Sequence, residues 1–228
     1  MLISELIIFI KGGQNMREIS IHNIGNVTGT HIAKKINAPD KANLLGYGAE
    51  ILIGGIVKLA VLFLISALLG VVIEVAILLL VVATMRTLSG GAHCTAYYRC
   101  LITSVLVFTT LGYTIKTIYP FLSVLPSTVL GGIILMSIYL YWCYAPQAPP
   151  NKPFKTKAAK TSFHRYTLIV ALTLALIAIL MGIESLISWI IAGGLLWQAF
   201  TLTPIGYGFI KFMDDLLSQK KKGVTNNG

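Results

Sequence analysis

Hydrophobic residues along this chain form long runs that short polar or glycine-containing segments interrupt. The runs lie near residues 47–68, 69–85, 101–119, 121–144, 166–181 and 185–202. A helix needs roughly 20 residues to cross the hydrocarbon core of a bilayer, and most of these runs approach that length. Gly70, Pro120 and Gly182 stand where paired runs meet and are typical turn residues. The pattern predicts a six-span membrane domain within residues 44–205.

Residues 1–43 and 206–228 flank this membrane domain and have a different periodicity. In the first segment, isoleucine or threonine recurs at three- and four-residue spacing, at Ile21, Ile24, Thr28, Ile32 and Ile36. In the second, the spacing places four apolar residues on one helical face: Phe209, Phe212, Met213 and Leu216. We expect an amphipathic interfacial helix at each terminus, although a soluble helix packed on a cytoplasmic loop is an equal alternative for the first segment. The sequence therefore predicts an all-α, polytopic integral membrane protein with about six transmembrane helices.

Composition excludes a soluble globular domain. Hydrophobic residues make up 56% of the 228-residue chain and charged residues 11%, whereas soluble domains carry about 25% charged residues. The net charge is +10. In the six-span arrangement, all Lys and Arg except Lys58 and Lys116 fall on the side that holds both termini, residues 86–100 and the basic loop 145–165. The positive-inside rule places that side in the cytoplasm beside anionic lipid, so we expect membrane lipid rather than nucleic acid as a partner.

Three ionisable residues lie inside the predicted spans: Glu50, Lys58 and Glu74. Such groups are costly in a bilayer and by default face the interior of the helix bundle. Glu50 and Lys58 are separated by about two helical turns on one face, which fits a structural ion pair. In a small multi-span peptide transporter or exporter, the same three side chains would line a transport path. Both interpretations are open at this point.

A polar interruption at residues 86–100 reads RTLSGGAHCTAYYRC. It contains a thiol, an imidazole and flexible backbone donors, which are what a cysteine nucleophile needs. On a helix His93 and Cys100 would share one face, whereas Cys94 would point about 100° away from His93. Seven residues of straight helix separate two backbones by about 10 Å, but a thiol–imidazole contact needs about 3 Å. We therefore expect the helix to begin after His93 or to break near it, with irregular backbone at Gly90-Gly91.

The neighbouring residues fit the same chemistry. The imidazole of His93 would raise the thiolate fraction of Cys100 and later protonate a leaving amine. Arg86 and Arg99 add positive charge that favours a thiolate. Backbone N–H groups around Gly90-Gly91 can stabilise an oxyanion.

Simpler explanations exist for each of these features. A histidine and a cysteine close in sequence are often incidental, and a Gly-Gly pair often only allows a turn to pack. One His and two Cys without Cys-x-x-Cys pairing disfavour a metal site, so no metal or cofactor is expected. No Asp or Asn lies in the stretch to orient His93. Glu50 is the candidate for that role, and Gln198 is a less favoured one.

The pattern Arg86-x4-Gly-x-His93-x6-Cys100 closely resembles the signature of the accessory gene regulator B family, AgrB. Residues 144–153 (YAPQAPPNKP) resemble the family's later proline-rich linker, and residues 47–50 (YGAE) resemble its first-span motif. The resemblance covers essentially the whole chain in length, span count and motif order. It implies a multi-pass protein of the bacterial cell membrane, with both termini and the active site on the cytoplasmic side.

The resemblance also implies an activity: a membrane cysteine endopeptidase that processes an AgrD-like pro-peptide for quorum sensing. Cys100 would attack a peptide carbonyl with His93 as base and then acid, so that the C-terminal tail leaves and a thioester remains. An internal Cys or Ser of the peptide would then displace Cys100 and give a thiolactone or lactone. The family's substrates have acidic tails, which we expect basic loop residues to bind: Lys152, Lys155, Lys157 and Lys160. The family also suggests a homodimer.

Overall fold

The computed structural model describes residues 21–92, 94–148, 154 and 156–218. The chain divides into two compact units, Met1–Ala60 and Val61–Gly228, which are treated separately below. The elements within the described ranges are helical, which confirms the predicted all-α class. Residues 1–20 of the predicted first segment and 219–228 of the basic tail lie outside the described residues.

The first unit is a pair of helices that touch through glycines. Helix α2 (Ile21–Lys35) is followed by a 3-10 turn, η1 (Pro39–Lys41), and by α3 (Ala42–Leu68), which begins in this unit. The buried positions of α2 are small residues at four-residue spacing, Gly25, Gly29 and Ala33. A Cβ at Gly29 would overlap the backbone of Gly46 in α3. Small residues allow helix backbones to approach closely in membranes.

The predicted isoleucine stripe of α2 does not make this contact. Ile24, Ile32 and Ile36 are exposed in the first unit. The sequence thus predicts the helix correctly, but its packed face is the one that carries glycine and alanine. Contact of these exposed isoleucines with lipid stays a prediction.

Five helices are long and apolar enough to cross a membrane, and these are α3, α4 (Val72–Ser89), α5 (Tyr97–Leu122), α6 (Ser127–Tyr144) and α7 (Lys157–Met181). Helices α8 (Leu186–Phe200) and α9 (Pro204–Ser218) pass the same criterion together, as a pair bent by 85°. This matches the predicted number of about six spans. The turns at Gly70 and Gly182 are also confirmed, because both residues have positive φ, 67° and 77°.

The predicted turn at Pro120 is wrong. Pro120 lies inside α5, which continues to Leu122, and the turn falls between the two helices at residues 123–126. A proline in the last turn of a helix removes only one late hydrogen bond, so the helix need not stop there. The N–H of Ser123 still donates to the carbonyl oxygen of Tyr119 at 2.9 Å.

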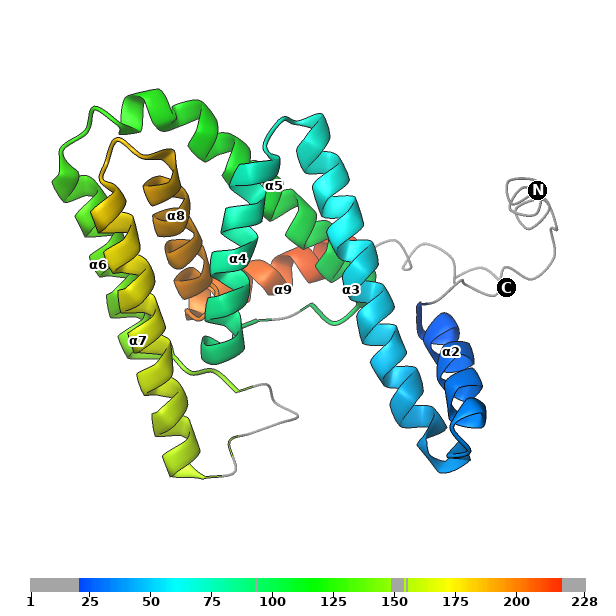
Figure 1. Cartoon of the computed structure of the whole chain (residues 1–228). Helices are drawn as coiled ribbons and strands as arrows, with labels where there is room; N and C mark the ends of the chain where they lie inside the picture. Colours follow the sequence, from blue (N-terminus) through cyan, green and yellow to red (C-terminus); the bar gives the residue numbers. More distant parts are fainter. Residues whose placement is uncertain (1–20, 93, 149–153, 155, 219–228) are drawn as a thin grey trace, which may run out of the picture. The chain divides into compact units, whose positions relative to one another are not determined.

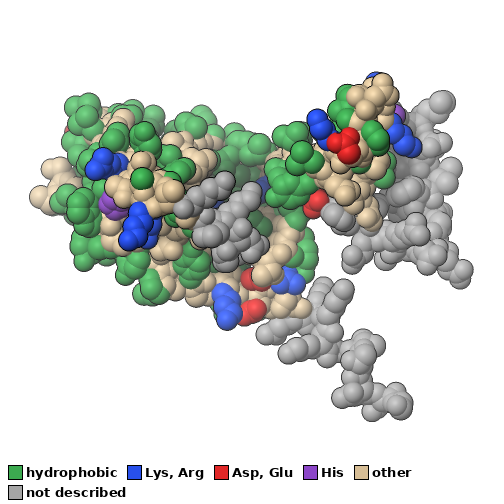
Figure 2. All heavy atoms as spheres, turned by 90° about the horizontal axis from the view of Figure 1, so that it is seen from below, with side chains coloured by type: hydrophobic (Ala, Val, Ile, Leu, Met, Phe, Trp, Pro, Cys, Tyr) green, Lys and Arg blue, Asp and Glu red, His purple; other side chains and the backbone are tan. Residues whose placement is uncertain are grey.

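One end of the second unit gathers the polar segments of the chain. The end of α4, the start of α5, the end of α6, the start of α7 and the end of α8 all lie there (Figure 1). Helix α9 turns away from α8 and packs against α5. Figure 2 views this end and shows Lys and Arg side chains between hydrophobic ones. Exposed basic residues of this end include Lys157, Lys160, Arg165 and Lys211.

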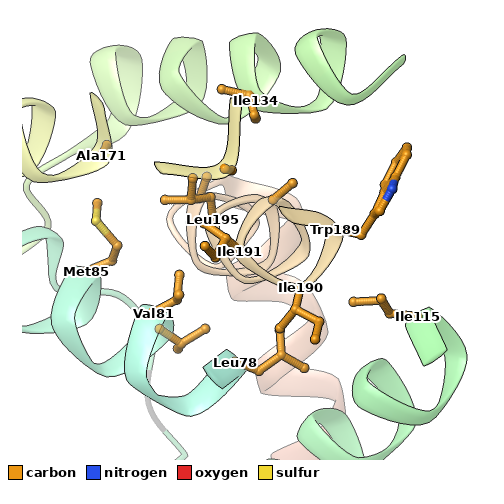
Figure 3. Close-up of a cluster of buried hydrophobic side chains, with 14 of the residues drawn as sticks. Leu78, Val81, Met85, Ile115, Ile134, Ala171, Trp189, Ile190, Ile191 and Leu195 are labelled. Atoms are coloured by element: carbon orange, nitrogen blue, oxygen red, sulfur yellow. The ribbon is translucent and has the colours of Figure 1, made fainter. Parts of the chain in front are cut away.

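The core of the second unit is built around α8. This helix contacts α4, α5, α6 and α7, and Figure 3 shows its side chains Trp189, Ile190, Ile191 and Leu195 surrounded by those helices. Two glycines permit the close approach. A Cβ at Gly193 would lie 2.8 Å from Cδ1 of Ile115, and one at Gly194 would lie 2.9 Å from Cγ1 of Val81. The 15-residue α8 therefore lies at the centre of the second unit, in contact with four other helices.

At the opposite end of the second unit an ion pair joins α4 to α5. Nζ of Lys116 lies 3.0 Å from Oε1 of Glu74 and donates a 2.6 Å hydrogen bond to the carbonyl oxygen of Gly70. The Glu74 side chain is 7% exposed. The expectation that Glu74 faces the interior is confirmed, and its partner is a lysine of the neighbouring helix.

Candidate active site

The backbone between α4 and α5 is irregular, as the spacing argument requires. Helix α4 ends at Ser89, Gly90 and Gly91 have φ values of 73° and 132°, and α5 begins only at Tyr97. Both glycines occupy conformations that side chains disfavour. His93 lies outside the described residues, so its contact with Cys100 stays a prediction. No straight helix, however, joins the described residues on either side of it to Cys100.

Cys100 lies in the first turn of α5. Its N–H donates to the carbonyl oxygen of Ala96 at 3.1 Å, and its side chain is partly exposed. Cys94 precedes the helix, with its Sγ 3.9 Å from Oγ1 of Thr103. Residue 94 is not helical, so helical geometry does not direct its side chain away from His93 as expected. The choice of Cys100 rests on its match to the family pattern.

Arg86 connects the last turn of α4 to the irregular segment. Its Nη2 donates a hydrogen bond to the carbonyl oxygen of Ala92, the residue before His93. The half-buried guanidinium also interacts electrostatically with Cys100, Cys94 and Tyr207. Arg86 thus holds the backbone next to His93 and lies within electrostatic range of both thiols.

Gln198 of α8 forms hydrogen bonds to the residues where α4 ends. Nε2 of Gln198 donates to the carbonyl oxygen of Gly90 at 2.8 Å and to Oγ of Ser89 at 3.1 Å. A Cβ at Gly91 would lie 3.4 Å from that nitrogen and 3.2 Å from Oγ1 of Thr201. Gln198 is fully buried. Its amide nitrogen therefore holds Ser89 and Gly90, and its candidate role in orienting His93, which lies outside the described residues, stays a prediction.

The two glycines differ in the donors they offer. The N–H of Gly90 donates to the carbonyl oxygen of Arg86 at 3.0 Å and so completes the last turn of α4. It is therefore not directed at a substrate. The Gly90 N–H thus belongs to α4, and a role of the Gly91 N–H as an oxyanion donor stays a prediction.

The proline-rich linker after α6 contacts the irregular segment directly. The N–H of Gln147 donates to the carbonyl oxygen of Ser89 at 2.8 Å, and Gly90 and Gln147 form an isolated parallel bridge. A Cβ at Gly90 would overlap the carbonyl oxygen of Gln147. The linker is held in turn by His164 of α7, whose Nδ1 lies 2.8 Å from the carbonyl oxygen of Ala145. The polar segment at residues 86–100 and the proline-rich linker, which are separate motifs in the sequence, are thus in direct contact.

Sequence reasoning missed Asp214 on α9. Its carboxylate accepts hydrogen bonds from the N–H and the hydroxyl of Thr95, at 3.0 and 2.7 Å. Nη1 of Arg99 lies 3.2 Å from the same carboxylate. The positive charge that was expected to favour a thiolate therefore also forms an ion pair with Asp214. The sequence feature that could have pointed to Asp214 is its spacing: it lies four residues after Ile210 and eight after Gly206, on one face of an amphipathic helix.

The remaining predicted site residues lie elsewhere or outside the described ranges. Glu50 belongs to the first unit, where its Cβ lies close to Gly25, and its proposed role toward His93 stays a prediction. Lys157 and Lys160 are exposed in the first turn of α7. Lys152 and Lys155 lie outside the described residues.

Comparisons with known proteins agree with the resemblance seen in the motifs. The family model for accessory gene regulator B matches residues 26–202. The accessory gene regulator protein B of Staphylococcus aureus (strain Newman) is 29% identical over 69% of this chain and 79% of its own length. An AgrB-like protein of Clostridium perfringens (strain SM101 / Type A) is 24% identical over 87% of this chain and 99% of its own. No solved structure matches the chain.

The matched range contains the irregular segment, the linker and Gln198, and it ends before α9. Together with the candidate spans, it identifies a multi-pass membrane protein of the accessory gene regulator system of quorum sensing. The chain belongs to the accessory gene regulator B family.

Proposed function

We propose that this protein is a membrane cysteine endopeptidase that cleaves and cyclises an AgrD-like pro-peptide, with Cys100 as nucleophile. The observation that carries the proposal is the irregular backbone at residues 90–92 and 94–96. This segment leaves the helical path at two glycines, is held by Arg86 and Gln198, and leads into the helical turn that presents Cys100. A cysteine nucleophile needs its base within hydrogen-bond reach, and irregular backbone before Cys100 allows a histidine seven residues earlier to approach the thiol.

The reaction proceeds in two acyl transfers. His93 removes the proton of the Cys100 thiol, and the sulfur attacks a peptide carbonyl near the C-terminal part of the substrate. The N–H of Gly91 and the charge of Arg86 stabilise the oxyanion. His93 then protonates the leaving amine, the C-terminal tail departs, and a thioester joins the remaining peptide to Cys100.

The second transfer closes the ring. An internal Cys or Ser of the bound peptide attacks the thioester carbonyl, the bond to Sγ of Cys100 breaks, and the free thiol is restored. The product is a thiolactone or lactone. Because the thioester keeps the acyl group activated, cyclisation needs no ATP, and exclusion of water around Cys100 would protect the intermediate from hydrolysis.

The polar end of the second unit faces the cytoplasm in this proposal. The positive-inside rule supports that orientation, since exposed lysines and arginines gather at this end. Lys157 and Lys160 at the start of α7, with Lys152 and Lys155 before it, bind the acidic tail of the substrate. The basic loop follows in sequence the linker whose Gln147 contacts Ser89 and Gly90.

The test is cleavage of the cognate pro-peptide by purified protein in liposomes. Cys100→Ala and His93→Ala lose cleavage while still inserting into the membrane, and Cys94→Ser and Cys143→Ser retain it. A hydroxylamine-labile adduct of peptide on Cys100 would demonstrate the thioester. Continued cleavage by Cys100→Ala refutes the mechanism, and loss of activity in Cys94→Ser alone assigns the nucleophile to Cys94.

A peptide exporter without protease activity is the competing function. In that alternative Glu74 would line a path, but its carboxylate is paired with Lys116 and buried between α4 and α5. The structure therefore favours a structural role for Glu74. A homodimer, which the family suggests, is tested by cross-linking the liposome-embedded protein.

A further inference from the structure

Asp214 closes a small network at the entrance to α5. Its Oδ1 accepts the N–H of Thr95 at 3.0 Å, and its Oδ2 accepts the Thr95 hydroxyl at 2.7 Å. Nη1 of Arg99 lies 3.2 Å from Oδ2 and 3.1 Å from Oγ1 of Thr95. The carboxylate thus caps, from another helix, the backbone that leads into α5, where Ala96 makes no side-chain cap of its own.

Asp214 lies on the packed face of α9, where its carboxylate contacts Thr95 and Arg99. The buried residues of α9 are Gly206, Ile210 and Asp214, which lie at four-residue spacing on one face. Asp214 is 6% exposed, whereas its neighbour Asp215 is exposed. A buried carboxylate is costly unless charged or hydrogen-bonded partners compensate it, and Thr95 and Arg99 supply those partners.

Helix α9 is firmly attached at its other end. A Cβ at Gly206 would overlap the carbonyl oxygen of Phe200, so the chain turns closely at this point. The rings of Trp197 and Phe200 on α8 pack against Phe209 on α9, with centroids 5.9 and 6.3 Å apart. The same α8 holds Gly90 through Gln198. Gln198 of α8 therefore holds residue 90, and Asp214 of α9 holds residue 95, so the helix pair α8–α9 holds the irregular segment near both of its ends.

We propose that Asp214 is a positioning residue for Cys100, acting through Thr95 to fix where α5 begins. This inference rests on the proposed role of Cys100 as nucleophile. Thr95 lies between the two proposed catalytic residues, and Cys100 donates its N–H to the carbonyl oxygen of the residue after Thr95. A shift of about 1 Å at a reacting group can cost on the order of 100-fold in rate. Asp214 touches neither substrate nor thiol in this role.

The first experiment separates positioning from binding by steady-state kinetics of pro-peptide cleavage in liposomes. For Asp214→Ala and Thr95→Val we expect kcat to fall on the order of 10- to 100-fold with KM changed less than about threefold. Asp214→Asn, which keeps the carbonyl acceptor for the Thr95 N–H, should lose less. Asp215→Asn is the matched control and should retain wild-type kinetics.

A second pair of measurements does not depend on peptidase activity. In a Cys94→Ser, Cys143→Ser background Cys100 is the only thiol, so its alkylation rate reports its surroundings. Asp214→Ala should change that rate and speed hydrogen exchange at the amides from Thr95 to Cys100, whereas Asp215→Asn should change neither. Ile210→Ala tests the shared packed face without touching the carboxylate, and it should leave kcat within about threefold of wild type.

The outcomes separate this inference from the proposed function. If Cys100→Ala abolishes cleavage but Asp214→Ala retains kcat, the positioning role is refuted and the peptidase stands. If Ile210→Ala lowers kcat as much as Asp214→Ala does, the carboxylate has no specific role and the inference also fails. If Cys100→Ala still cleaves, the proposed function fails, although faster exchange at Thr95 in Asp214→Ala would still show that Asp214 fixes the start of α5.

Discussion

The backbone N–H of Gln147 donates a 2.8 Å hydrogen bond to the carbonyl oxygen of Ser89, the last residue of α4. This contact places the linker that follows α6 directly against Gly90, where no side chain would fit. The linker leads to the exposed lysines of α7. The contact joins two segments that are far apart in sequence, the proline-rich linker and the irregular segment that leads to Cys100.

Gly90→Ala is the sharpest test of this contact. The new Cβ would overlap the carbonyl oxygen of Gln147, and φ of 73° is strained for alanine. We expect a loss of about 1–3 kcal/mol in unfolding free energy and severe loss of cleavage. Gly131→Ala, whose Cβ would meet open space on α6, is the control for thermal unfolding in detergent. Equal stability and activity in the two variants would contradict the contact.

Gln198→Leu removes the amide that holds Ser89 and Gly90. The carbonyl oxygen of Gly90 then loses its side-chain donor in a buried place, which we expect to cost about 1–3 kcal/mol of unfolding free energy. Because the irregular segment loses its support, cleavage should fall by more than insertion or expression does. Thermal unfolding and cleavage rates measure the two effects. Unchanged values in both would show that α8 does not hold the glycine pair.

Lys157 and Lys160 should act on substrate affinity rather than on chemistry. Replacing both with Gln removes two exposed charges from the start of α7. We expect KM to rise on the order of 2- to 10-fold at low salt, because exposed ion pairs contribute only modestly. The difference from wild type should shrink at high ionic strength. Lys211→Gln on α9 is the control, and an equal rise in KM there would indicate a nonspecific charge effect.

Breaking the ion pair between Glu74 and Lys116 should affect stability without affecting catalysis. Lys116→Ala leaves a buried carboxylate without its partner at 3.0 Å. Since Lys116 itself is half exposed, we expect a loss of about 1–3 kcal/mol in unfolding free energy, below the full cost for a buried pair.

The double variant Glu74→Gln, Lys116→Gln should recover part of that stability, because no uncompensated charge remains. Thermal unfolding measures both variants, and kcat should stay near wild type because the pair lies at the end of the unit opposite Cys100. A large fall in kcat with intact stability would instead implicate Glu74 in function and revive the transport interpretation.

Features that depend on local chemistry can be predicted from the amino-acid sequence. Hydrophobic runs predict the spanning helices because lipid requires apolar side chains and internally satisfied backbones. Gly90 and Gly91 predict the break before α5 because glycine tolerates the positive φ that they adopt. The seven-residue separation between His93 and Cys100 led to the prediction of a break in the helix between them, and α5 indeed begins only at Tyr97.

The tertiary structure alone decided which helix lies at the centre and which residues meet at the site. Apolar side chains that face lipid and apolar side chains that pack against protein have similar composition, so hydropathy did not mark α8 as the core. Pro120 remained helical because its place in the last turn made the missing donor inexpensive. Thr95 and Asp214 are 119 residues apart, and no local pattern joins them. They meet because α9 turns by 85° from α8 and packs against α5. This contact depends on how the helices pack and not on the order of residues along the chain.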